Sequence, residues 1–190
     1  MGIRCFIAIP LDAVIRKEIS SFIDYLGKSG ADVKWVRAEN LHITLKFLGD
    51  TEEYLLPDIK EKLSNISSLH KPFTVHLSGT GLFPDRRKPR VVWIDFGGGQ
   101  ELSKLQETVE ENLASLGYNK EKRRFSPHLT VGRVRSSRNL DSLLRGMEEQ
   151  RDKDFGNIEV ASFLLMKSDL KPGGAEYAAI AEFNLKKEEK

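Results

Sequence analysis

Two short segments with the same pattern, His-x-Thr-x with apolar residues at both x positions, place the strongest constraint on this chain. The first segment spans residues 42–45 and the second spans residues 128–131. Alternation of polar and apolar residues is typical of a half-buried β-strand, on which side chains i and i+2 share one face. The pattern therefore predicts two strands, each of which presents a histidine and a threonine together on the face opposite the core.

The spacing of the two segments indicates an internal duplication. The two histidines are 86 positions apart (128 − 42). At the same offset, the apolar run 5–9 corresponds to 91–95, and the strand-like run 73–77 corresponds to 159–163. Three matches at one offset favour a unit of strand, helix, His strand, helix and strand that is used twice. Two ordinary strands that each carry a histidine are the alternative interpretation.

Hydrophobic periodicity and turn residues predict the elements of the chain. Besides the two motif strands, we expect strands at 3–10, 33–36, 73–78, 91–96, 158–166 and 176–185. Helices are expected at 11–27, from Thr51 or Pro57 through Leu63, at 101–116 and at 139–150. Glycine and proline predict a linker loop at 79–89 and turns at 97–99 and 172–174, and the charged tail 186–190 is expected to be disordered.

Strands and helices alternate along the chain, which is typical of folds that combine both. The length of 190 residues and a hydrophobic content of 39% fit a single domain over 1–190. We expect lobe-like halves, roughly 1–85 and 90–170, followed by a last strand at 176–185. The duplication predicts a bilobal α+β fold in which two antiparallel-rich sheets face a central cleft and the helices lie outside. Ligands commonly bind in such a cleft.

Composition indicates more about where the protein acts than about what it binds. A net charge of +2 neither requires nor excludes a polyanionic partner, so local patches must decide. The single Cys5 cannot form an intrachain disulfide, and its apolar surroundings predict a small core residue. No apolar run approaches the roughly 20 residues of a membrane span. We therefore expect a cytoplasmic protein with no membrane partner, and a monomer.

The two motifs carry side chains suited to acid–base chemistry on a phosphodiester. Imidazole exchanges protons near neutral pH, so His42 and His128 can serve as an acid and base pair across a cleft. Thr44 and Thr130 can donate hydrogen bonds to an oxyanion between the strands. Arg133 is a candidate for a bidentate phosphate contact. Simple alternation places Arg133 on the face opposite His128, so this role requires a bulge or a strand end.

A metal site is the main rival interpretation of the two histidines. Without a nearby pattern of Cys or carboxylate ligands they make a poor zinc site, which usually needs three protein ligands. We therefore expect neither a metal nor another cofactor. His76 and His70 are expected outside the site, His76 on a solvent-facing strand and His70 at a helix end, where a cation complements the helix dipole.

Basic and aromatic residues near the motifs are candidates for contacts to RNA. Two basic groups are candidates for holding backbone phosphates, namely Arg86, Arg87, Lys88 and Arg90, and Lys122, Arg123 and Arg124. Three aromatic residues are candidates for stacking on a terminal base, namely Phe83, Phe125 and Trp35. Solvated loops and core packing are the alternative interpretations.

The paired motifs resemble those of the 2H phosphoesterase superfamily, most closely the RNA 2′,3′-cyclic phosphodiesterases, also called 2′-5′ RNA ligases. The matching segments are 4–9, 40–49, 81–84 and 125–133. The resemblance implies a bilobal α+β fold with a central cleft and no metal. It also implies hydrolysis of a terminal 2′,3′-cyclic phosphate of RNA to a 2′-phosphate, with ligation of tRNA halves as the reverse reaction.

The resemblance further implies that His42 is the proton donor and His128 the proton acceptor, an order that the sequence alone does not set. Thr44, Thr130 and Arg133 are then the substrate-binding residues. A non-catalytic module that binds RNA or a nucleotide in the same cleft is the alternative function. Tight binding of the product without hydrolysis would favour that alternative.

Overall fold

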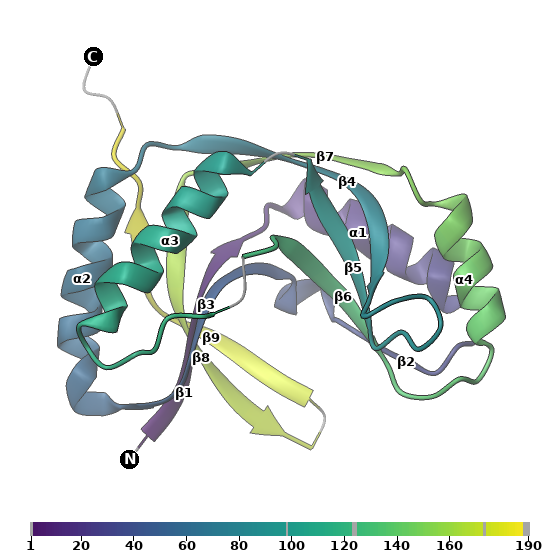
Figure 1. Cartoon of the computed structure of the whole chain (residues 1–190), viewed down its shortest axis with the longest axis horizontal. Helices are drawn as coiled ribbons and strands as arrows, with labels where there is room; N and C mark the ends of the chain where they lie inside the picture. The colour runs from purple at the N-terminus through teal and green to yellow at the C-terminus, as the bar shows by residue number, and fades with distance from the viewer. Residues whose placement is uncertain (1, 98, 123–124, 173, 188–190) are drawn as a thin grey trace.

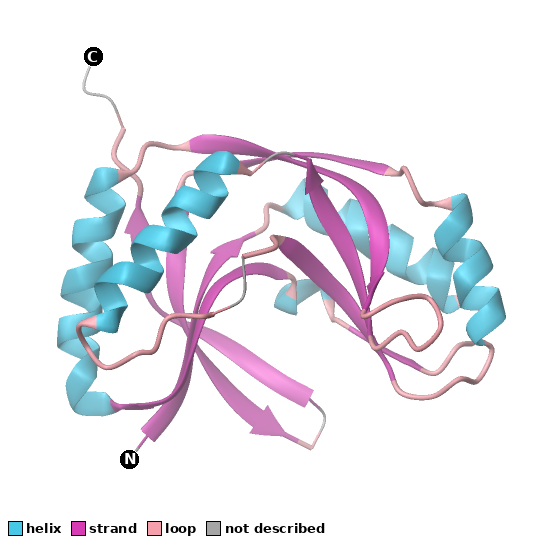
Figure 2. Cartoon of the chain, viewed as in Figure 1, coloured by secondary structure: helices cyan, strands magenta, loops and turns pink. Residues whose placement is uncertain are grey.

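The computed structural model describes residues 2–97, 99–122, 125–172 and 174–187. Its strands are β1 (Gly2–Pro10), β2 (Val33–Trp35), β3 (His42–Glu52), β4 (Phe73–Phe83), β5 (Val91–Gly97), β6 (His128–Val134), β7 (Asp154–Val160), β8 (Ser162–Lys171) and β9 (Gly174–Asn184), and its helices are α1 (Ala13–Gly27), α2 (Leu56–Leu69), α3 (Gln100–Ala114) and α4 (Leu140–Glu149). Within the described residues the strands form two antiparallel sheets, in the orders β3-β1-β8-β9 and β2-β6-β5-β4-β7. Helices flank both sheets (Figure 2), so the predicted α+β class is confirmed.

The two predicted units follow each other in the chain as β1-α1-β3-α2-β4 and β5-α3-β6-α4-β7. In each unit the first strand pairs antiparallel with the motif strand, β1 with β3 and β5 with β6. Two further strands, β8 and β9, then extend the first sheet by pairing beyond β1. The order of strands and helices therefore agrees with the duplication that the 86-residue spacing predicts.

The two lobes do not coincide with the sequence halves 1–85 and 90–170. The first lobe is the four-stranded sheet with α2 and α3, and the second lobe is the five-stranded sheet with α1 and α4. Figure 1 shows α2 and α3 together at one end of the molecule and α4 at the other. The helix that follows the first strand of each unit crosses to the opposite lobe, since α1 packs on β7 and α3 packs on β3. Each lobe therefore contains elements of both halves.

Helix α1 shows how the sequence sets these elements. The Asp12 side chain caps its start, where Oδ1 accepts a hydrogen bond of 2.9 Å from the Ile15 backbone N–H. The apolar stripe faces the core and consists of Ile15, Ile19, Phe22, Ile23 and Leu26. Val14, directly before this stripe in the sequence, is 72% exposed and lies outside it.

The start of α2 agrees with the expected alternative at Pro57, whereas other element boundaries differ from those predicted. Helix α2 begins at Leu56 with Pro57 in its first turn, whereas Thr51 is buried in β3 and is not its N-cap. Strand β4 continues to Phe83, because Gly79 adopts a φ of +82° at a break in register and lets the strand resume pairing. The run expected as one strand at 158–166 is divided between β7 and β8. These two strands lie in different sheets, so the chain changes sheet within a run that the sequence pattern predicts as one strand.

The inner faces of the sheets and the apolar stripes of the helices form a single buried cluster. Cys5 lies within it, as predicted, and burial raises the pKa of its thiol. In the part of the chain that the structure describes, no helix combines the length and apolar character needed to span a bilayer.

Candidate active site

Both motif strands present their polar pairs on one face, as the alternation predicts. His42 and Thr44 are partly exposed on β3, whereas Ile43 and Leu45 between and after them are buried. In β6 the same pattern recurs, with partly exposed polar residues and fully buried apolar ones, namely His128 and Thr130 against Leu129 and Val131. Each histidine is thus fixed with its threonine on a strand that is anchored by its opposite face.

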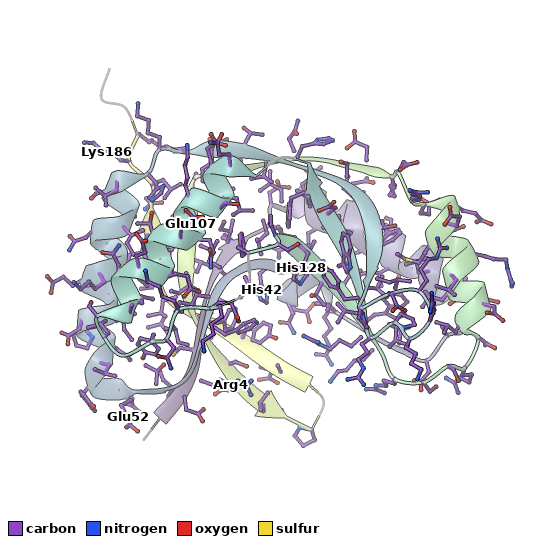
Figure 3. All side chains as sticks on the ribbon, in the orientation of Figure 1. Arg4, His42, Glu52, Glu107, His128 and Lys186 are labelled. Atoms are coloured by element: carbon purple, nitrogen blue, oxygen red, sulfur yellow. The ribbon has the colours of Figure 1, made fainter. Side chains whose placement is uncertain are left out.

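The two motif strands meet in the middle of the molecule. Strands β3 and β6 contact each other although they belong to different sheets. Figure 3 shows the side chains of His42 and His128 in this central region, between the two lobes. A cleft of about 1320 Å³ is lined by residues of both strands, including Thr44 and His128. The predicted central cleft is therefore present, and motif residues of both units border it.

The backbone holds both histidine rings in the same way. Nδ1 of His42 lies 2.7 Å from the carbonyl oxygen of Asn40, and Nδ1 of His128 lies 2.8 Å from the carbonyl oxygen of Ser126. A carbonyl oxygen can only accept a hydrogen bond, so Nδ1 carries a proton in each ring. The atom left to exchange a proton is therefore Nε2, which accepts one when the ring is neutral and donates one when it is charged.

Aromatic neighbours make the two histidines chemically different. The ring of His42 lies 4.9 Å from the ring of Phe6 and meets Tyr177 edge-on at 5.4 Å, measured between centroids. Burial lowers the pKa of His42, although its hydrogen bond to the Asn40 carbonyl acts in the opposite direction. The neutral ring is therefore favoured in the free protein. His128 meets the ring of Phe83 edge-on at 5.1 Å.

A β-bulge directly follows the threonine of the first motif. Thr44 lies opposite Ala8 in β1, and Lys46 lies opposite the adjacent Ile7. Leu45 is therefore an extra residue without a partner position on β1. One extra residue reverses the alternation of the strand beyond it, so residues after the bulge change faces.

The second motif has a bulge at the equivalent place. Thr130 lies opposite Trp93 in β5, and Gly132 lies opposite the adjacent Val92, which makes Val131 the extra residue. Beyond the bulge, Arg133 lies opposite Val91, which shares a strand face with Trp93. Arg133 therefore lies on the same face of the sheet as Thr130 and His128. Simple alternation places Arg133 on the opposite face, and a phosphate contact at the site required a bulge or a strand end. This bulge meets that requirement.

Phe47 is a site residue that the sequence analysis missed. It lies opposite Phe6 in β1 and contacts its ring at 6.2 Å between centroids, on the face that carries His42. Its side chain is 70% exposed and lines the cleft. Phe47 and Arg133 are 86 positions apart (133 − 47), so they occupy equivalent places after the two bulges. The repeat offset, applied to Arg133, would have identified Phe47.

A buried ion pair beneath the cleft is a second feature that the sequence did not reveal. Lys46 and Glu110 are only 5% and 8% exposed, and the Lys46 ammonium donates to the Glu110 carboxylate. Lys46 also donates to the carbonyl oxygen of Asn119 at 2.9 Å. The Glu110 carboxylate also accepts hydrogen bonds from the Gln106 side-chain amide and the Glu121 backbone N–H, each at 3.2 Å. The pair therefore fixes the start of the segment that leads to the second motif.

The basic candidates have different surroundings, and one of them, Arg87, lines a separate cavity and not the cleft. Arg86 forms an ion pair with Glu148 of α4 and does not line the cleft. Lys88, Arg90 and Lys122 line the cleft, so their contact with a polyanion stays a prediction. Several predicted features lie outside the described residues, namely the basic side chains Arg123 and Arg124, the turn residues Gly98 and Gly173, and the tail 188–190.

The aromatic candidates also have different surroundings. Phe83 and Phe125 line the cleft, and Phe83 stacks on Trp93 with 4.9 Å between ring centroids. Trp35 packs across Gly132, where an added Cβ would lie 2.7 Å from the indole ring. Gly132 is therefore required for this close approach, and Trp35 serves packing as the alternative interpretation held.

The two other histidines have local partners. Nδ1 of His76 lies 2.9 Å from Asn157 Oδ1, on a partly exposed strand. Nε2 of His70 lies 3.0 Å from Thr108 Oγ1 of α3, and burial lowers the pKa of His70. His70 is the C-cap of α2, so it lies at a helix end as expected, and its burial favours the neutral ring over the cation. Among the described residues, no three side chains of His, Cys, Asp or Glu are grouped as metal ligands.

Known proteins resemble this chain over ranges that include both His-x-Thr-x motifs. The family described as LigT like Phosphoesterase matches residues 9–93 and 97–177. The chain belongs to this family. The RNA 2′,3′-cyclic phosphodiesterase of Methanothermobacter thermautotrophicus is 36% identical over 185 residues, covering 97% of this chain and 100% of that relative. The RNA 2′,3′-cyclic phosphodiesterase of Archaeoglobus fulgidus is 40% identical over 182 residues, covering 95% of this chain and 99% of the relative.

Solved structures agree with the family assignment. A protein of Thermus thermophilus superimposes with a TM-score of 0.78 at 28% identity, covering 96% of this chain and 97% of its own. Escherichia coli LigT, complexed with 3′-AMP, superimposes with a TM-score of 0.74 at 25% identity, covering 98% and 100%. The bilobal architecture of two sheets and a central cleft is therefore that of the LigT-like family.

Proposed function

We propose that this protein is an RNA 2′,3′-cyclic phosphodiesterase that acts in the cytoplasm and leaves a 2′-phosphate. One observation carries the proposal: two motif strands border one cleft and hold their histidines by identical Nδ1 contacts, which leaves both Nε2 atoms for proton transfer. The names of the relatives support the substrate class. The complex of E. coli LigT with 3′-AMP supports a nucleotide as the occupant of the cleft.

In the proposed reaction, water attacks the phosphorus atom and the bond from phosphorus to O3′ breaks. His128 Nε2 accepts the proton of the water, and His42 Nε2 donates a proton to O3′ as it leaves. The hydroxyls of Thr44 and Thr130 and the guanidinium of Arg133 stabilise the charge on the non-bridging oxygens. The product has a 2′-phosphate and a free 3′-hydroxyl, and the two rings recover their starting protonation by exchange with solvent.

The assignment of His42 as the acid requires it to be protonated when substrate is bound. Burial disfavours that form in the free protein. A phosphodiester anion beside the ring favours the charged form, because an opposite charge within about 4–6 Å raises the pKa of a histidine. We therefore assign the protonation of His42 to the substrate complex, where the proton is needed. An RNA 5′-hydroxyl in place of water gives a 2′-5′ linkage by the same step, which would join tRNA halves.

Phe47 supplies a surface for the terminal base. Its exposed ring lies on the cleft side of β3, on the face that carries His42 and Thr44. A nucleobase stacked on an aromatic side chain gains about 1–3 kcal/mol without sequence preference.

Both motifs and both post-bulge residues come from one chain, so the site is complete in a monomer.

The test is turnover of 2′,3′-cyclic AMP and of an RNA oligomer that ends in a cyclic phosphate. We expect ³¹P NMR of the products to show the phosphate on the 2′-oxygen. The His42→Ala and His128→Ala variants should each lose roughly 10²- to 10⁴-fold in kcat, while circular dichroism shows an intact fold. Activity close to that of the unmodified protein in either variant would refute the two-histidine mechanism.

Two further outcomes separate the alternatives. Tight binding of the 2′-phosphate product without any turnover would identify a non-catalytic nucleotide-binding module. A chelator series addresses the metal interpretation, since the proposed chemistry is carried by side chains alone. Activity that is lost with chelator and restored by zinc would contradict the proposal.

A further inference from the structure

A second cavity, of about 530 Å³, lies next to the catalytic cleft and is strongly basic. Its walls come from the loop between β4 and β5 and from the end of β6 with the turn that follows. Half of its lining residues are cationic, namely Arg87, Lys88, Arg90, Arg133 and Arg135, and none is acidic. We call this cavity, with its five cationic lining residues, the basic cavity.

The cations of the basic cavity are not neutralised by carboxylates. Among the described residues, no ion pair involves any of the five side chains. Two acidic side chains that contact these loops, Asp85 and Asp32, accept hydrogen bonds from other groups. Asp85 Oδ1 accepts from the backbone N–H groups of Arg87 and Lys88 at 2.7 and 3.2 Å, and Asp32 Oδ2 accepts from the Ser136 hydroxyl at 2.8 Å. Five uncompensated positive charges favour an anionic ligand.

The loop that carries three of these cations is fixed by backbone hydrogen bonds. The Arg90 N–H donates to the Phe83 carbonyl at 2.6 Å, and the Val134 N–H donates to the Arg90 carbonyl at 3.0 Å. The second of these bonds ties the loop directly to the motif strand β6. A ligand in the basic cavity therefore meets a backbone that is already ordered, which reduces the entropic cost of binding.

The basic cavity continues the catalytic cleft. Lys88 and Arg90 line both of them. Arg133 provides the second connection, because the bulge at Val131 turns it to the face of Thr130 and His128. An extended anion held at the motif residues can therefore pass directly into the basic cavity.

We propose that the basic cavity binds the phosphodiester on the 5′ side of the terminal nucleotide, an inference that rests on the proposed function. A 2′,3′-cyclic phosphate occupies both the 2′ and the 3′ oxygen, so the RNA can continue only through the 5′ oxygen. The next phosphate of the strand must therefore leave the cleft on that side. Arginine and lysine are the usual ligands of RNA backbone phosphates. The preferred substrate is thus the end of an oligonucleotide rather than a mononucleotide.

The test compares 2′,3′-cyclic AMP with the dinucleotide ApA that ends in a 2′,3′-cyclic phosphate. For the unmodified protein we expect kcat/KM to be roughly tenfold or more higher for the dinucleotide. The double variant Arg87→Gln/Arg135→Gln should lose this preference and keep its activity on 2′,3′-cyclic AMP. The dependence of log kcat/KM on log salt for a longer oligomer should become shallower by about 1.4, as expected for two lost contacts to a single strand.

A matched control removes the same charge elsewhere. Arg86 and Arg151 both contact Glu148 and do not line the basic cavity. The Arg86→Gln/Arg151→Gln variant should therefore keep the preference for the dinucleotide. An equal loss in this control would show that net charge, and not the basic cavity, is responsible, and would overturn the inference. A preference retained in Arg87→Gln/Arg135→Gln would overturn it as well.

A binding measurement separates this inference from the proposed function. Calorimetry with adenosine 2′-monophosphate and with ApA 2′-phosphate needs no turnover. Tighter binding of the dinucleotide that disappears in Arg87→Gln/Arg135→Gln supports the basic cavity even if the protein hydrolyses neither cyclic substrate, in which case only the proposed function fails. Equal affinity for both ligands, or competition by a polyglutamate peptide at the same concentration as ApA 2′-phosphate, would refute a phosphodiester subsite.

Discussion

The buried pair of Lys46 and Glu110 gives a prediction whose size follows from the structure. Glu110→Gln keeps the shape of the side chain and removes its charge, so the Lys46 ammonium remains buried without a counter-ion. Removing one partner of a buried ion pair typically costs about 3–5 kcal/mol. Both side chains line the cleft, where water can approach, so we expect the lower end of this range, about 3 kcal/mol. For a chain of this length that corresponds to a decrease in Tm of roughly 6–12 °C.

A double-mutant cycle assigns this loss to the pair itself. Lys46→Met replaces the ammonium by an apolar group of similar length, so the Lys46→Met/Glu110→Gln variant contains no unpaired buried charge. We expect it to be more stable than Glu110→Gln alone, with a coupling energy of roughly 1–3 kcal/mol. Unfolding in urea, followed by circular dichroism, measures all four members of the cycle.

The surface pair of Lys171 and Glu176 is the matched control. Its nitrogen and oxygen atoms are 2.6 Å apart, but both side chains are more than half exposed. Glu176→Gln should therefore leave the urea midpoint unchanged. The interpretation of the buried pair as a stabilising anchor would be refuted if Glu110→Gln changed the urea midpoint as little as Glu176→Gln does. Strictly additive effects in the cycle would refute it as well. The same anchor holds the Asn119 carbonyl, so kcat/KM for 2′,3′-cyclic AMP should fall together with the stability.

Two further predictions concern the substrate complex. Phe47→Ala should raise KM for 2′,3′-cyclic AMP roughly 5- to 150-fold at nearly constant kcat, because one base stack is lost. Turnover of glycerol 1,2-cyclic phosphate, which has no base, should be unchanged. Equal effects on both substrates would contradict a stacking role. Because burial lowers the pKa of His42 in the free protein and a bound phosphate raises it, the alkaline limb of kcat should lie at higher pH than that of kcat/KM. Rate profiles from pH 5 to 9 measure both limbs, and coincident limbs would refute a shift on binding.

The motif faces were predictable from the sequence because strand alternation is a local property. Residues 42–44 and 128–130 have regular partners on β1 and β5, so each histidine and threonine share a face as their spacing predicts. The repeat offset also gave the order of the two units without any structure. Local pattern and repeat spacing were therefore enough to predict the shared faces of the two motif strands and the fold class.

The position of Arg133 could not be obtained in this way. Its face depends on the bulge at Val131, and a bulge is a property of the pairing with β5, more than thirty residues earlier in the chain. The division of 158–166 into β7 and β8 has a similar cause, because the apolar pattern continues through Ala161 while the partner strand changes. The exchange of α1 and α3 between lobes is a third case, since a helix stripe does not specify which sheet it covers.

The duplicated site is symmetric in its backbone and asymmetric in its chemistry. Both units hold a histidine by the carbonyl two residues earlier and place a bulge directly after the threonine. The equivalent post-bulge positions then carry Phe47 in one unit and Arg133 in the other. In the proposed reaction these two residues contact different parts of the substrate, because an aromatic ring suits the base and a guanidinium suits phosphate oxygens.

The pair β8 and β9, which follows the two units, adds a second asymmetry. Tyr177 of β9 meets the ring of His42 edge-on, and the Asn40 side chain donates to the Ala175 carbonyl of β9 at 3.0 Å. Asn40 is also the residue whose carbonyl holds Nδ1 of His42. The appended strands thus contribute to the burial that lowers the pKa of His42, whereas His128 packs against Phe83 of its own lobe. The two histidines of the duplicated unit therefore have different surroundings, because an element outside the repeat packs against only one of them.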